Sequence, residues 1–552
     1  MAVVLGVNAV FHDPAAAIVV DGTTVAAAEE ERFSRRKHGK SPVPFSTWEL
    51  PEHAIAHCLE AAGVAPGELD AVAYSYDPRL ATVPSDRPVE DRWEGLRTLY
   101  AERAPHFLRT LLPGLDVAAF RHVPHHLAHA ASAWGHAPFE TCAVMVLDGR
   151  GERGSYLAGR ARGATFEPIV DQELPHSLGL RYEELTAHLG YRRSSDEYKV
   201  MAMASYGRPA HLDELRRLLR TTGDGGFVTE EVDWSRFAPP GLGDGAIDEP
   251  HVDLASSMQC RLEELLLELA GWLHERTGER RLAMAGGVAL NCVANSRIFE
   301  HGPFEDVWVQ PAAGDAGTAL GAALHTAAQL GDTPVPPGST ALGPKWSDDE
   351  LAEVLRAAAV PLERPPDLAA AVADVLAADG VVAWFQGRSE FGPRALGHRS
   401  LLAHPGHEHN LERLNDVKGR EHFRPVAPMV LLEAAKDLFE GGPIPSPYML
   451  FTHRVRDGWA DRIPAVVHVD GTARVQTVDP VAEPLVHRML TEFRRRTGLP
   501  TVVNTSLNTA GRPMVDHPRD ALECFGSAPI DALAIGPFLV RRAAMFAPEG
   551  TR

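Results

Sequence analysis

The stretch Pro124–Glu152, PHHLAHAASAWGHAPFETCAVMVLDGRGE, combines a helix, a strand and the beginning of a chemical site. The alanine-rich run after His125 predicts a helix, which would carry His125 and His129 one turn apart on the same face. Val144–Leu147 is a short apolar strand that runs into Asp148. Because open α/β folds keep their ligands at the carboxyl ends of strands, the stretch predicts an α/β fold in which two imidazoles and a carboxylate share one cation.

The nature of that cation follows from the ligand types. Two nitrogens and an oxygen suit zinc, iron or manganese better than calcium. However, a chain with 26 histidines should contain a spacing-of-four pair by accident, and His122 with His126 is another such pair. On the spacing alone, a metal site and an accidental pair both remain open.

Composition excludes several classes of protein. At 552 residues the chain is too long for one core and predicts two or three domains. No apolar run approaches the roughly 20 residues that span a bilayer, so we expect a soluble cytoplasmic protein that binds no membrane. The formal charge of −20 disfavours nucleic acid and anionic surfaces. The five scattered cysteines form no C-x-x-C pair and predict reduced, mostly buried thiols.

Two similar β-units are expected in the first half of the chain. Val3–Val7, Ala15–Val20 and Thr24–Ala28 alternate with turn signals and predict an antiparallel meander. Val144–Leu147 and Gly154–Ala161 repeat the pattern after a helical region. Paired units of this kind are how actin-like ATPase folds hold phosphates, although fold analogy does not establish function.

A long helix and a glycine turn follow. Apolar residues at helical spacing predict a helix over Val252–Thr277, and Arg281–Ala285 predicts a strand. The strand runs into Gly286 and Gly287, which would let backbone approach a nucleotide closely. A tight packing turn explains two glycines equally well.

The proline-rich stretch Leu330–Ser347 lacks helical periodicity and predicts a linker. We therefore expect domains at 1–340 and 341–552. Strands are predicted in the second domain at Val381–Phe385 and Thr501–Val503.

The second domain also carries an arginine-rich cluster. Gly387–Ser400 contains several arginines between glycines, and Lys418, Arg424, Arg474 and Asn504–Asn508 follow it. Arginine offers a planar fork to phosphate or carboxylate, lysine adds a point charge, and Asn and Ser donate neutral hydrogen bonds. The cluster predicts an anion pocket, although surface arginines paired with acidic side chains would show the same residue types.

Over nearly its full length the chain resembles the O-carbamoyltransferases related to the tobramycin, geldanamycin and nodulation enzymes. This resemblance implies an actin-like N-terminal domain similar to the tRNA threonylcarbamoyl transferase. It also implies a YrdC-like α/β C-terminal domain similar to the threonylcarbamoyl-adenylate synthase. The matching blocks are, in order, Phe11-His12-Asp13, Glu29-Glu30-Glu31-Arg32-Phe33, His125-His126-Leu127-Ala128-His129, Asp148-Gly149, Gly286-Gly287-Val288, Asp315-Ala316-Gly317, Gly392-Pro393-Arg394-Ala395-Leu396-Gly397 and Asn504-Thr505-Ser506.

The resemblance further implies an ATP-dependent carbamoyltransferase with two half-reactions. In the C-terminal pocket, carbamoyl phosphate would be cleaved to carbamate and phosphate. The carbamate would then attack ATP with its Mg²⁺ and give carbamoyl-adenylate and pyrophosphate. Clustered cations would offset the repulsion between these anions. The resemblance gives catalytic roles to Arg394 and Lys418, and ligand-binding roles to Arg424, Arg474, Asn504 and Ser506.

Transfer would take place in the N-terminal domain. There the resemblance implies Fe²⁺ or another divalent transition metal. His12 would be the general base toward the acceptor hydroxyl, for which an imidazole pKa near neutrality is suited; alternatively, His12 caps its turn. The implied metal ligands are His125, His129, Asp148 and Asp315. The residues implied to line the adenylate site are Gly149, Lys199, Gly286, Gly287 and Asn291.

Two other functions compete with this interpretation. A tRNA threonylcarbamoyl-type transferase would share both folds, but the acidic charge argues against it. A non-catalytic actin-like nucleotide-binding regulator would not need the second anion pocket. The expected acceptor is a hydroxylated small molecule, such as an antibiotic or another natural product. The segments expected near its pocket, Tyr76–Arg103 and Arg192–Asp196, show no pattern that identifies it. A homodimer is plausible.

Overall fold

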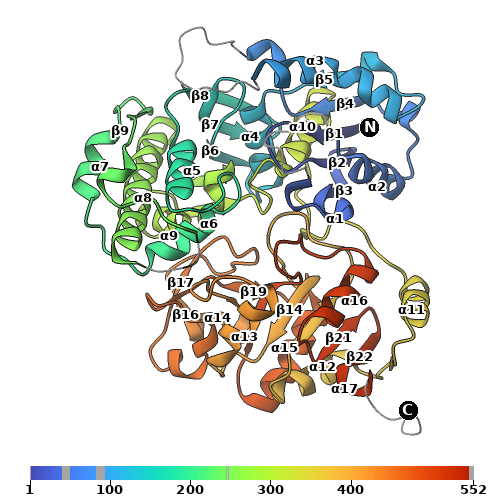
Figure 1. Cartoon of the computed structure of the whole chain (residues 1–552). Coiled ribbons are helices and arrows are strands. Elements are labelled where there is room, and N and C mark those ends of the chain that lie inside the picture. The colour runs from blue at the N-terminus through green and yellow to red at the C-terminus, as the bar shows by residue number, and fades with distance from the viewer. Residues whose placement is uncertain (1, 40–49, 82–93, 244, 246–247, 546–552) are drawn as a thin grey trace. The chain divides into compact units, whose positions relative to one another are not determined.

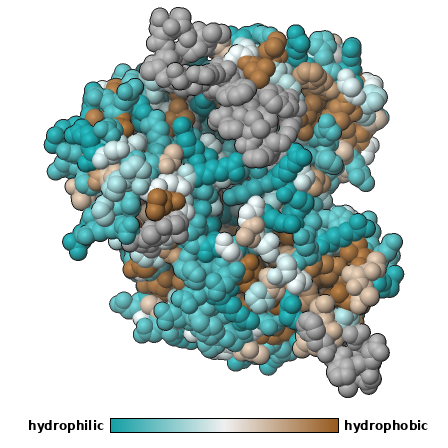
Figure 2. Space-filling model, in the orientation of Figure 1, coloured by the Kyte–Doolittle hydropathy of each residue, from teal (hydrophilic) through white to brown (hydrophobic). Residues whose placement is uncertain are grey.

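The chain forms two compact units of mixed α/β architecture, Met1–Pro337 and Gly338–Arg552 (Figure 1). The computed structural model describes residues 2–39, 50–81, 94–243, 245 and 248–545. Within this part of the chain, no helix is long and apolar enough to cross a membrane. The face shown in Figure 2 is largely hydrophilic, as expected for a chain with many more acidic than basic residues.

The first sheet begins with the predicted meander. Strands β1 (Val3–Asn8), β2 (Ala15–Val20) and β3 (Thr23–Glu29) pair antiparallel, which confirms the alternation read from the sequence. Strands β4 (Ala71–Tyr74) and β5 (Phe120–His122) then add in parallel on the other side of β1. The resulting order is β3-β2-β1-β4-β5.

The second sheet of the first unit repeats this order. Strands β6 (Thr141–Leu147), β7 (Gly154–Arg162) and β8 (Thr165–Glu173) form an antiparallel meander. Strands β11 (Arg281–Ala285) and β12 (Asp306–Val309) extend it in parallel from β6. The order β8-β7-β6-β11-β12 therefore repeats the order of the first sheet and confirms the expected pair of similar β-units.

Two helices join these sheets. Helix α10 (Ala316–Gln329) packs on β1 and β2, α4 (His125–His136) packs on β6 and β11, and α4 and α10 pack on each other (Figure 1). The helices approach closely because Gly321 of α10 faces α4, where a Cβ atom would collide with the carbonyl oxygen of Ala128. Both helices begin beside the ends of strands, which is where the candidate metal ligands lie.

The remaining elements of the first unit lie around this core. Helix α8 contains the predicted Val252–Thr277 segment and is followed by β11, as expected. The other elements are α1 (Glu31–Ser34), α2 (Glu52–Ala62), α3 (Glu94–Leu111), α5 (Leu178–His188), α6 (Glu197–Ala204), α7 (Leu212–Leu218), β9 (Leu219–Thr221), β10 (Phe227–Thr229), α8 (Glu249–Thr277) and α9 (Cys292–His301).

The second unit is built on a sheet of order β19-β15-β20-β14-β13-β21-β22. The predicted strands Val381–Phe385 and Thr501–Val503 are present as β13 and β20. The strands of this sheet are β13 (Val382–Phe385), β14 (Arg399–Ala403), β15 (Ala427–Leu431), β19 (Gln476–Val478), β20 (Thr501–Ser506), β21 (Ala532–Ile535) and β22 (Phe538–Arg541).

Helices and a small sheet complete this unit. Its helices are α11 (Asp348–Ala357), α12 (Leu368–Ala377), α13 (His409–Lys418), α14 (Ala435–Leu438), α15 (Pro484–Thr497), α16 (Pro518–Ser527) and α17 (Arg542–Met545). The small sheet contains β16 (Phe439–Glu440), β17 (His453–Val455) and β18 (Thr472–Ala473). The end of β13 pairs with the start of β14, and the end of β20 does the same. One edge of the sheet therefore gathers the predicted anion-binding segments.

Candidate functional sites

Four buried side chains meet where α4, β6 and α10 converge. His125 and His129 project from the first turns of α4, Asp148 follows β6, and Asp315 precedes α10. Nε2 of His125 lies 3.4 Å from Oδ2 of Asp148, and Nε2 of His129 lies 3.6 Å from Oδ1 of Asp315. One potential ligand atom from each residue lies within 4.8 Å of the others. The structure thus brings all four sequence-predicted ligands together.

The hydrogen bonds of this cluster fit a metal ion. Nδ1 of His125 is 3.3 Å from the carbonyl oxygen of Ser75, to which it can donate, and this leaves the Nε2 lone pair facing the carboxylates. Both ring nitrogens of His129 and Nε2 of His125 are buried and find no hydrogen-bond partner among the described residues. Since buried polar atoms are normally satisfied, the two Nε2 atoms that face the carboxylates fit a bound cation, whereas Nδ1 of His129 lies on the other side of its ring. Two imidazoles and two carboxylates suit a divalent transition metal.

The carboxylates and imidazoles of the cluster shift one another's pKa values. Burial by itself lowers the pKa of His125, but the Asp148 and Asp315 carboxylates outweigh it and raise that pKa well above the usual value. Burial by itself raises the pKa of Asp148, yet the neighbouring imidazoles hold it below its usual range. The adjacent His126 is different, because burial lowers its pKa to about 3 and it stays neutral.

Neighbouring backbone fixes the ligands in place. The N–H group of Gly287 donates to Oδ1 of Asp148 at 2.9 Å, which turns Oδ2 toward the imidazoles. The preceding Gly286 has φ of 94° and fits so closely against Leu147 that a Cβ atom would collide with that residue's carbonyl oxygen. The glycine pair therefore packs against the carboxylate loop and supports it directly.

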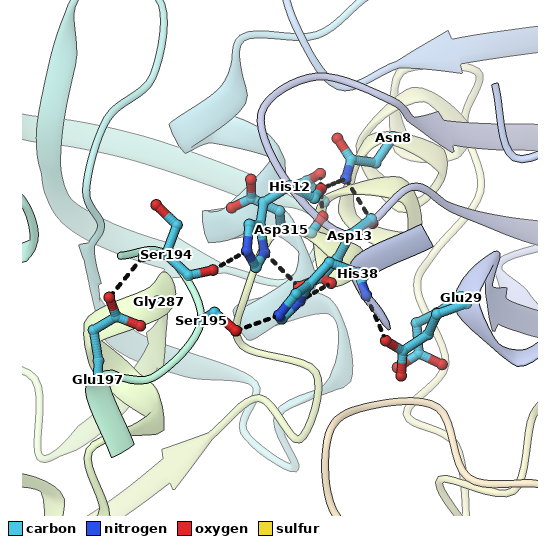
Figure 3. A network of polar contacts seen from close by, with 12 residues as sticks. Asn8, His12, Asp13, Glu29, His38, Ser194, Ser195, Glu197, Gly287 and Asp315 are labelled. Carbon is cyan, nitrogen blue, oxygen red and sulfur yellow. Dashed lines mark hydrogen bonds and ion pairs between the residues drawn. The ribbon is translucent and has the colours of Figure 1, made fainter. Parts of the chain in front are cut away.

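A second polar network surrounds His12 (Figure 3). Nδ1 of His12 donates to Oδ2 of Asp13 at 2.7 Å, and Nε2 contacts the carbonyl oxygen of Ser194. Oδ1 of Asp13 accepts a hydrogen bond of 2.9 Å from Nδ1 of His38. Asn8 holds the turn by donating to the carbonyl oxygens of both His12 and Asp13. The His12 side chain is 27% exposed, so it remains accessible from outside.

The contacts of His12 move its pKa away from neutrality. Burial lowers the pKa of His12, but Asp13, and more weakly Asp315 and the Ser194 carbonyl, outweigh it and raise the pKa to about 10. Both ring nitrogens face oxygen atoms, so His12 is a cation here and can accept a proton only after losing one. The sequence could not show that the Arg192–Asp196 segment supplies the second oxygen. Of the other segment expected near the acceptor pocket, residues 82–93 lie outside the described residues.

The expected adenylate-binding residues have identifiable contacts. Gly149 lies beside the Glu183 carboxylate, from which an added Cβ atom would be 3.0 Å. The amide of Asn291 accepts from the backbone of Ala294 at 3.0 Å and donates to Gln259 at 2.8 Å, so it caps α9. Lys199 pairs with Asp196 at 3.2 Å and lies over the ring of Tyr191. Their role toward a nucleotide stays a prediction.

In the second unit, Lys418 is held at the sheet edge described above. Its Nζ, at the end of α13, donates to the backbone carbonyl and the hydroxyl of Ser506 at 2.6 and 2.9 Å, and to Oδ1 of Asn508. Asn504 lies two residues earlier on β20 and donates to the carbonyl oxygen of Ala395, while its own Oδ1 is buried and accepts no hydrogen bond from the described part of the chain. The structure therefore brings Lys418, Ser506 and Asn504 to one end of β20.

The arginines of the second unit divide by role. The Nε of Arg474 is buried and has no hydrogen-bond partner within the described residues, and Arg424 pairs with Glu421 at 3.3 Å. By contrast, Arg388 and Arg399 of the same glycine-rich stretch donate to backbone carbonyls, and Arg399 also stacks on Phe385. Sequence reasoning placed all of them in one cluster because residue type alone does not separate arginines that bind backbone carbonyls from arginines with other contacts.

Several residues of these sites were missed. One oxygen of the buried Glu390 accepts from the backbone of Leu396, His398 and Arg399, and this holds the loop that carries Arg394. Asp13 stood inside a matching block without a role, and nothing in the sequence singled out His38. A carboxylate directly after a candidate base is a usable signal, whereas the spacing of His38 gives none.

Comparisons with known proteins agree with the two-unit division. The family model Carbamoyltransferase N-terminus matches residues 3–324, and Carbamoyltransferase C-terminus matches residues 373–542. The chain is 36% identical to nodulation protein NolNO of Sinorhizobium fredii over 97% of this chain and 80% of that protein. It is 35% identical to an uncharacterized protein of Synechocystis sp. over 98% of this chain and 97% of that protein.

Similarity to solved structures is more remote. HypF of T. kodakarensis matches 60% of this chain and about half (48%) of its own, with 14% identity and a TM-score of 0.39, too low to establish a shared fold. The sequence matches, in contrast, cover both units. Because both family models and the nodulation relative match it, the chain belongs to the carbamoyltransferase family and is an enzyme that transfers carbamoyl groups.

Proposed function

We propose that the protein is an ATP-dependent O-carbamoyltransferase working in two steps. The second unit, which we take to be YrdC-like, converts carbamoyl phosphate and ATP into carbamoyl-adenylate, phosphate and pyrophosphate. The first unit, which we take to be actin-like, transfers the carbamoyl group to a hydroxyl of a small molecule and releases AMP. The observation that carries this proposal is the presence of two polar sites in different units, one with residues that could hold a cation and the other with cationic side chains.

In the second unit the cationic side chains gather the anionic reactants. Lys418, fixed by Ser506 and Asn508, presents a positive charge at the end of β20. The buried Oδ1 of Asn504 can accept from the NH₂ group of carbamate, and Arg394 and Arg474 supply guanidinium donors for phosphate oxygens. Offsetting the repulsion between carbamate and ATP is the main requirement of this step.

In the first unit the neutral form of His12 takes the proton of the acceptor hydroxyl as its oxygen attacks the carbamoyl carbon. The acceptor hydroxyl would replace the Ser194 carbonyl at Nε2, while Nδ1 stays bound to Asp13. His125, His129, Asp148 and Asp315 would hold a divalent transition metal, Fe²⁺ or another, which would supply positive charge for the adenylate phosphate. With Asp315 bound to a cation, its carboxylate would raise the pKa of His12 less. The AMP leaving group departs as the C–O bond to the acceptor forms.

The first step can be tested without knowing the acceptor. The purified, metal-loaded protein is incubated with ATP, Mg²⁺ and carbamoyl phosphate, and pyrophosphate is measured against a sample lacking carbamoyl phosphate. We expect release that depends on carbamoyl phosphate, its loss in Arg394→Ala, and its retention in His12→Asn. A folded protein that released no pyrophosphate under these conditions would refute the adenylate mechanism. Loss of release in His12→Asn would show that the two steps are assigned to the wrong units.

A further inference from the structure

The acidic block Glu29–Phe33 has no role in the proposed reaction, yet its three carboxylates have defined partners. Glu29 pairs with Arg32 at 3.2 Å. Glu30 accepts from Nδ1 of His53 at 2.6 Å and from the backbone at the start of α2. The third carboxylate, Glu31, accepts the backbone N–H of His38 at 2.8 Å. The block therefore ties α1 to α2 and fixes the position of His38.

His38 completes a chain of hydrogen bonds that ends at His12 (Figure 3). The Asp13 carboxylate uses Oδ1 for His38 and Oδ2 for His12, at 2.9 and 2.7 Å. The other ring nitrogen of His38 is 2.8 Å from the hydroxyl of Ser195. One tautomer of His38 satisfies both contacts, with Nδ1 donating to Asp13 and Nε2 accepting from Ser195. The two imidazole centroids are 4.3 Å apart.

The backbone around this chain adopts conformations that side chains rarely allow. Phe11, Asp13, His38 and Ser194 all have φ between 44° and 65°, in the left-handed region. Such conformations persist only where surrounding contacts impose them, and they concentrate at functional sites. Here Asn8 holds the His12–Asp13 turn, and Glu31 holds His38. The fold therefore keeps the side chains of His12, Asp13 and His38 in contact at a cost in conformational energy.

We propose that His38 is a positioning residue for carbamoyl transfer, which it serves by fixing the Asp13 carboxylate that orients the imidazole of His12. A carboxylate bound at one oxygen only can rotate about its Cβ–Cγ bond. Binding the second oxygen to His38 locks the carboxylate plane, so Nδ1 of His12 keeps its partner and Nε2 keeps its direction. The inference rests on the proposed role of His12 as the base.

The arrangement also connects His38 to the acceptor side. Ser194 contacts His12 and the adjacent Ser195 contacts His38, so one loop between α5 and α6 touches both rings. Ser194 is anchored in turn by Glu197 through its N–H group and by Glu183 through its hydroxyl, at 2.7 and 2.9 Å. When the acceptor displaces the Ser194 carbonyl, the Asp13–His38 pair keeps the His12 ring in place.

Two substitutions separate positioning from mere packing. In His38→Asn the amide nitrogen occupies the place of Nδ1 and still donates to Asp13, whereas His38→Ala removes the donor. The matched control is His53→Asn, because His53 also pairs with a carboxylate of the same acidic block but is 66% exposed and forms no part of the His12 chain. Bound metal is measured in every variant to show that the first unit is folded.

The decisive readout needs no substrate. NMR spectra of ¹⁵N-histidine-labelled protein, with diamagnetic Zn²⁺ added for the metal centre, report the ring nitrogens of His12, which are assigned by their loss in His12→Asn. We expect the His12 signals to be unchanged in His38→Asn and His53→Asn. In His38→Ala they should shift or broaden by more than their linewidth. Unchanged His12 signals in His38→Ala would overturn the proposal.

Two further measurements distinguish the positioning role of His38 from a role in adenylate formation and from metal binding. Once an acceptor is known, kcat for transfer should fall roughly 10–100-fold in His38→Ala and recover in His38→Asn, the range seen when a supporting residue is lost. Pyrophosphate release should stay at the wild-type rate in both. If pyrophosphate release is absent in the wild type, the adenylate mechanism fails while the NMR result still decides on His38. A second metal equivalent that is lost in His38→Asn would identify His12, Asp13 and His38 as a metal site and overturn the positioning role.

Discussion

The candidate metal cluster of the first unit and the lysine cluster of the second differ in the charge of the side chains that would face a ligand. In the first, two buried carboxylates face imidazole nitrogens that no described residue satisfies with a hydrogen bond. In the second, Lys418 already binds three oxygen atoms and still carries its charge to the end of β20. The residues of the first cluster suit a cation, and those of the second suit anions. The proposed two-step reaction uses this contrast, with anionic reagents assembled in the second unit and transfer in the first.

The two clusters also differ in how they are supported. Each ligand of the first lies in or directly beside a regular element, since α4, β6 and α10 supply all four. The second depends more on loops, such as the one that Glu390 holds around Arg394. Rigid elements give a preformed ligand geometry, whereas loops allow several bulky anions to enter. Because the two sites lie in different units, we expect a substitution in one site to leave the metal content or the pyrophosphate release of the other unchanged.

The largest expected effect is the loss of metal in His129→Ala. This change removes one of two imidazoles from a cluster that is otherwise closed and buried, so affinity should fall well beyond the roughly 10–100-fold caused by losing a supporting residue. Elemental analysis of the purified protein should show about one divalent metal per chain in the wild type and almost none in the variant.

The matched control for this prediction is His122→Ala. His122 forms the other spacing-of-four pair with His126, but it lies on β5 rather than on α4 and contacts the carbonyl oxygen of Tyr76. Its loss should leave the metal in place, and pyrophosphate release should continue in both variants. Full metal content in His129→Ala would mean that the cluster is a hydrogen-bonded histidine–aspartate group and not a metal centre.

The next effect in size is expected for Lys418→Met in the second unit. Removing a preorganised charge from an active site typically slows the reaction by about 10²–10³-fold, so pyrophosphate release should fall by that amount. Metal content should remain at the wild-type level, because the metal ligands belong to the first unit. The variant Lys436→Met, at an exposed lysine of α14, serves as the control. A normal rate in Lys418→Met would remove this lysine from the reaction and weaken the contrast between the two sites.

The sequence predicted the frame of the first site better than its electrostatics. The spacing of His125 and His129 indicates one helical face, and an apolar strand leading into Asp148 indicates a sheet end, because both patterns depend on local periodicity. Asp315 came only from resemblance, since α10 reaches the cluster through tertiary packing. The rise in the pKa of His12 comes mainly from the adjacent Asp13, and Asp315 and Ser194, which lie far along the chain, add to it only in the folded protein.

The second site shows the limit of residue type as a signal. The density of arginine after β13 indicated an anion pocket, but it did not distinguish Arg394 from Arg399, which is fully buried on Phe385 and bound to backbone carbonyls. Burial of a whole guanidinium depends on how the loop folds back on the sheet, and no local pattern encodes that. Likewise, Glu390 organises the loop through three backbone N–H groups that only the folded chain brings together.

The smallest effect concerns stability in acid and is expected for His136→Gln. His136 is buried at the end of α4, with Nε2 2.9 Å from the Thr24 hydroxyl, and burial lowers its pKa to about 3. The unfolded chain binds a proton below pH 6.5, whereas the folded chain does not until about pH 3. This residue therefore costs stability as the pH falls between those values, by roughly 1.4 kcal/mol per pH unit.

Glutamine can keep the contact with Thr24 but cannot titrate, so His136→Gln should remove about 2 kcal/mol of the loss that the wild type suffers between pH 7.5 and pH 5. Urea unfolding at the two pH values measures the difference, and the half-exposed His301 on α9 provides a His→Gln control that should leave the loss unchanged.

In the second unit, burial also lowers the pKa of His404, to about 4, so this histidine should resist protonation less strongly than His136 does. If His136→Gln lost as much stability in acid as the wild type, His136 would be protonated in the folded protein. Helix α4 would then be more open to water than its packing on α10 and the second sheet indicates.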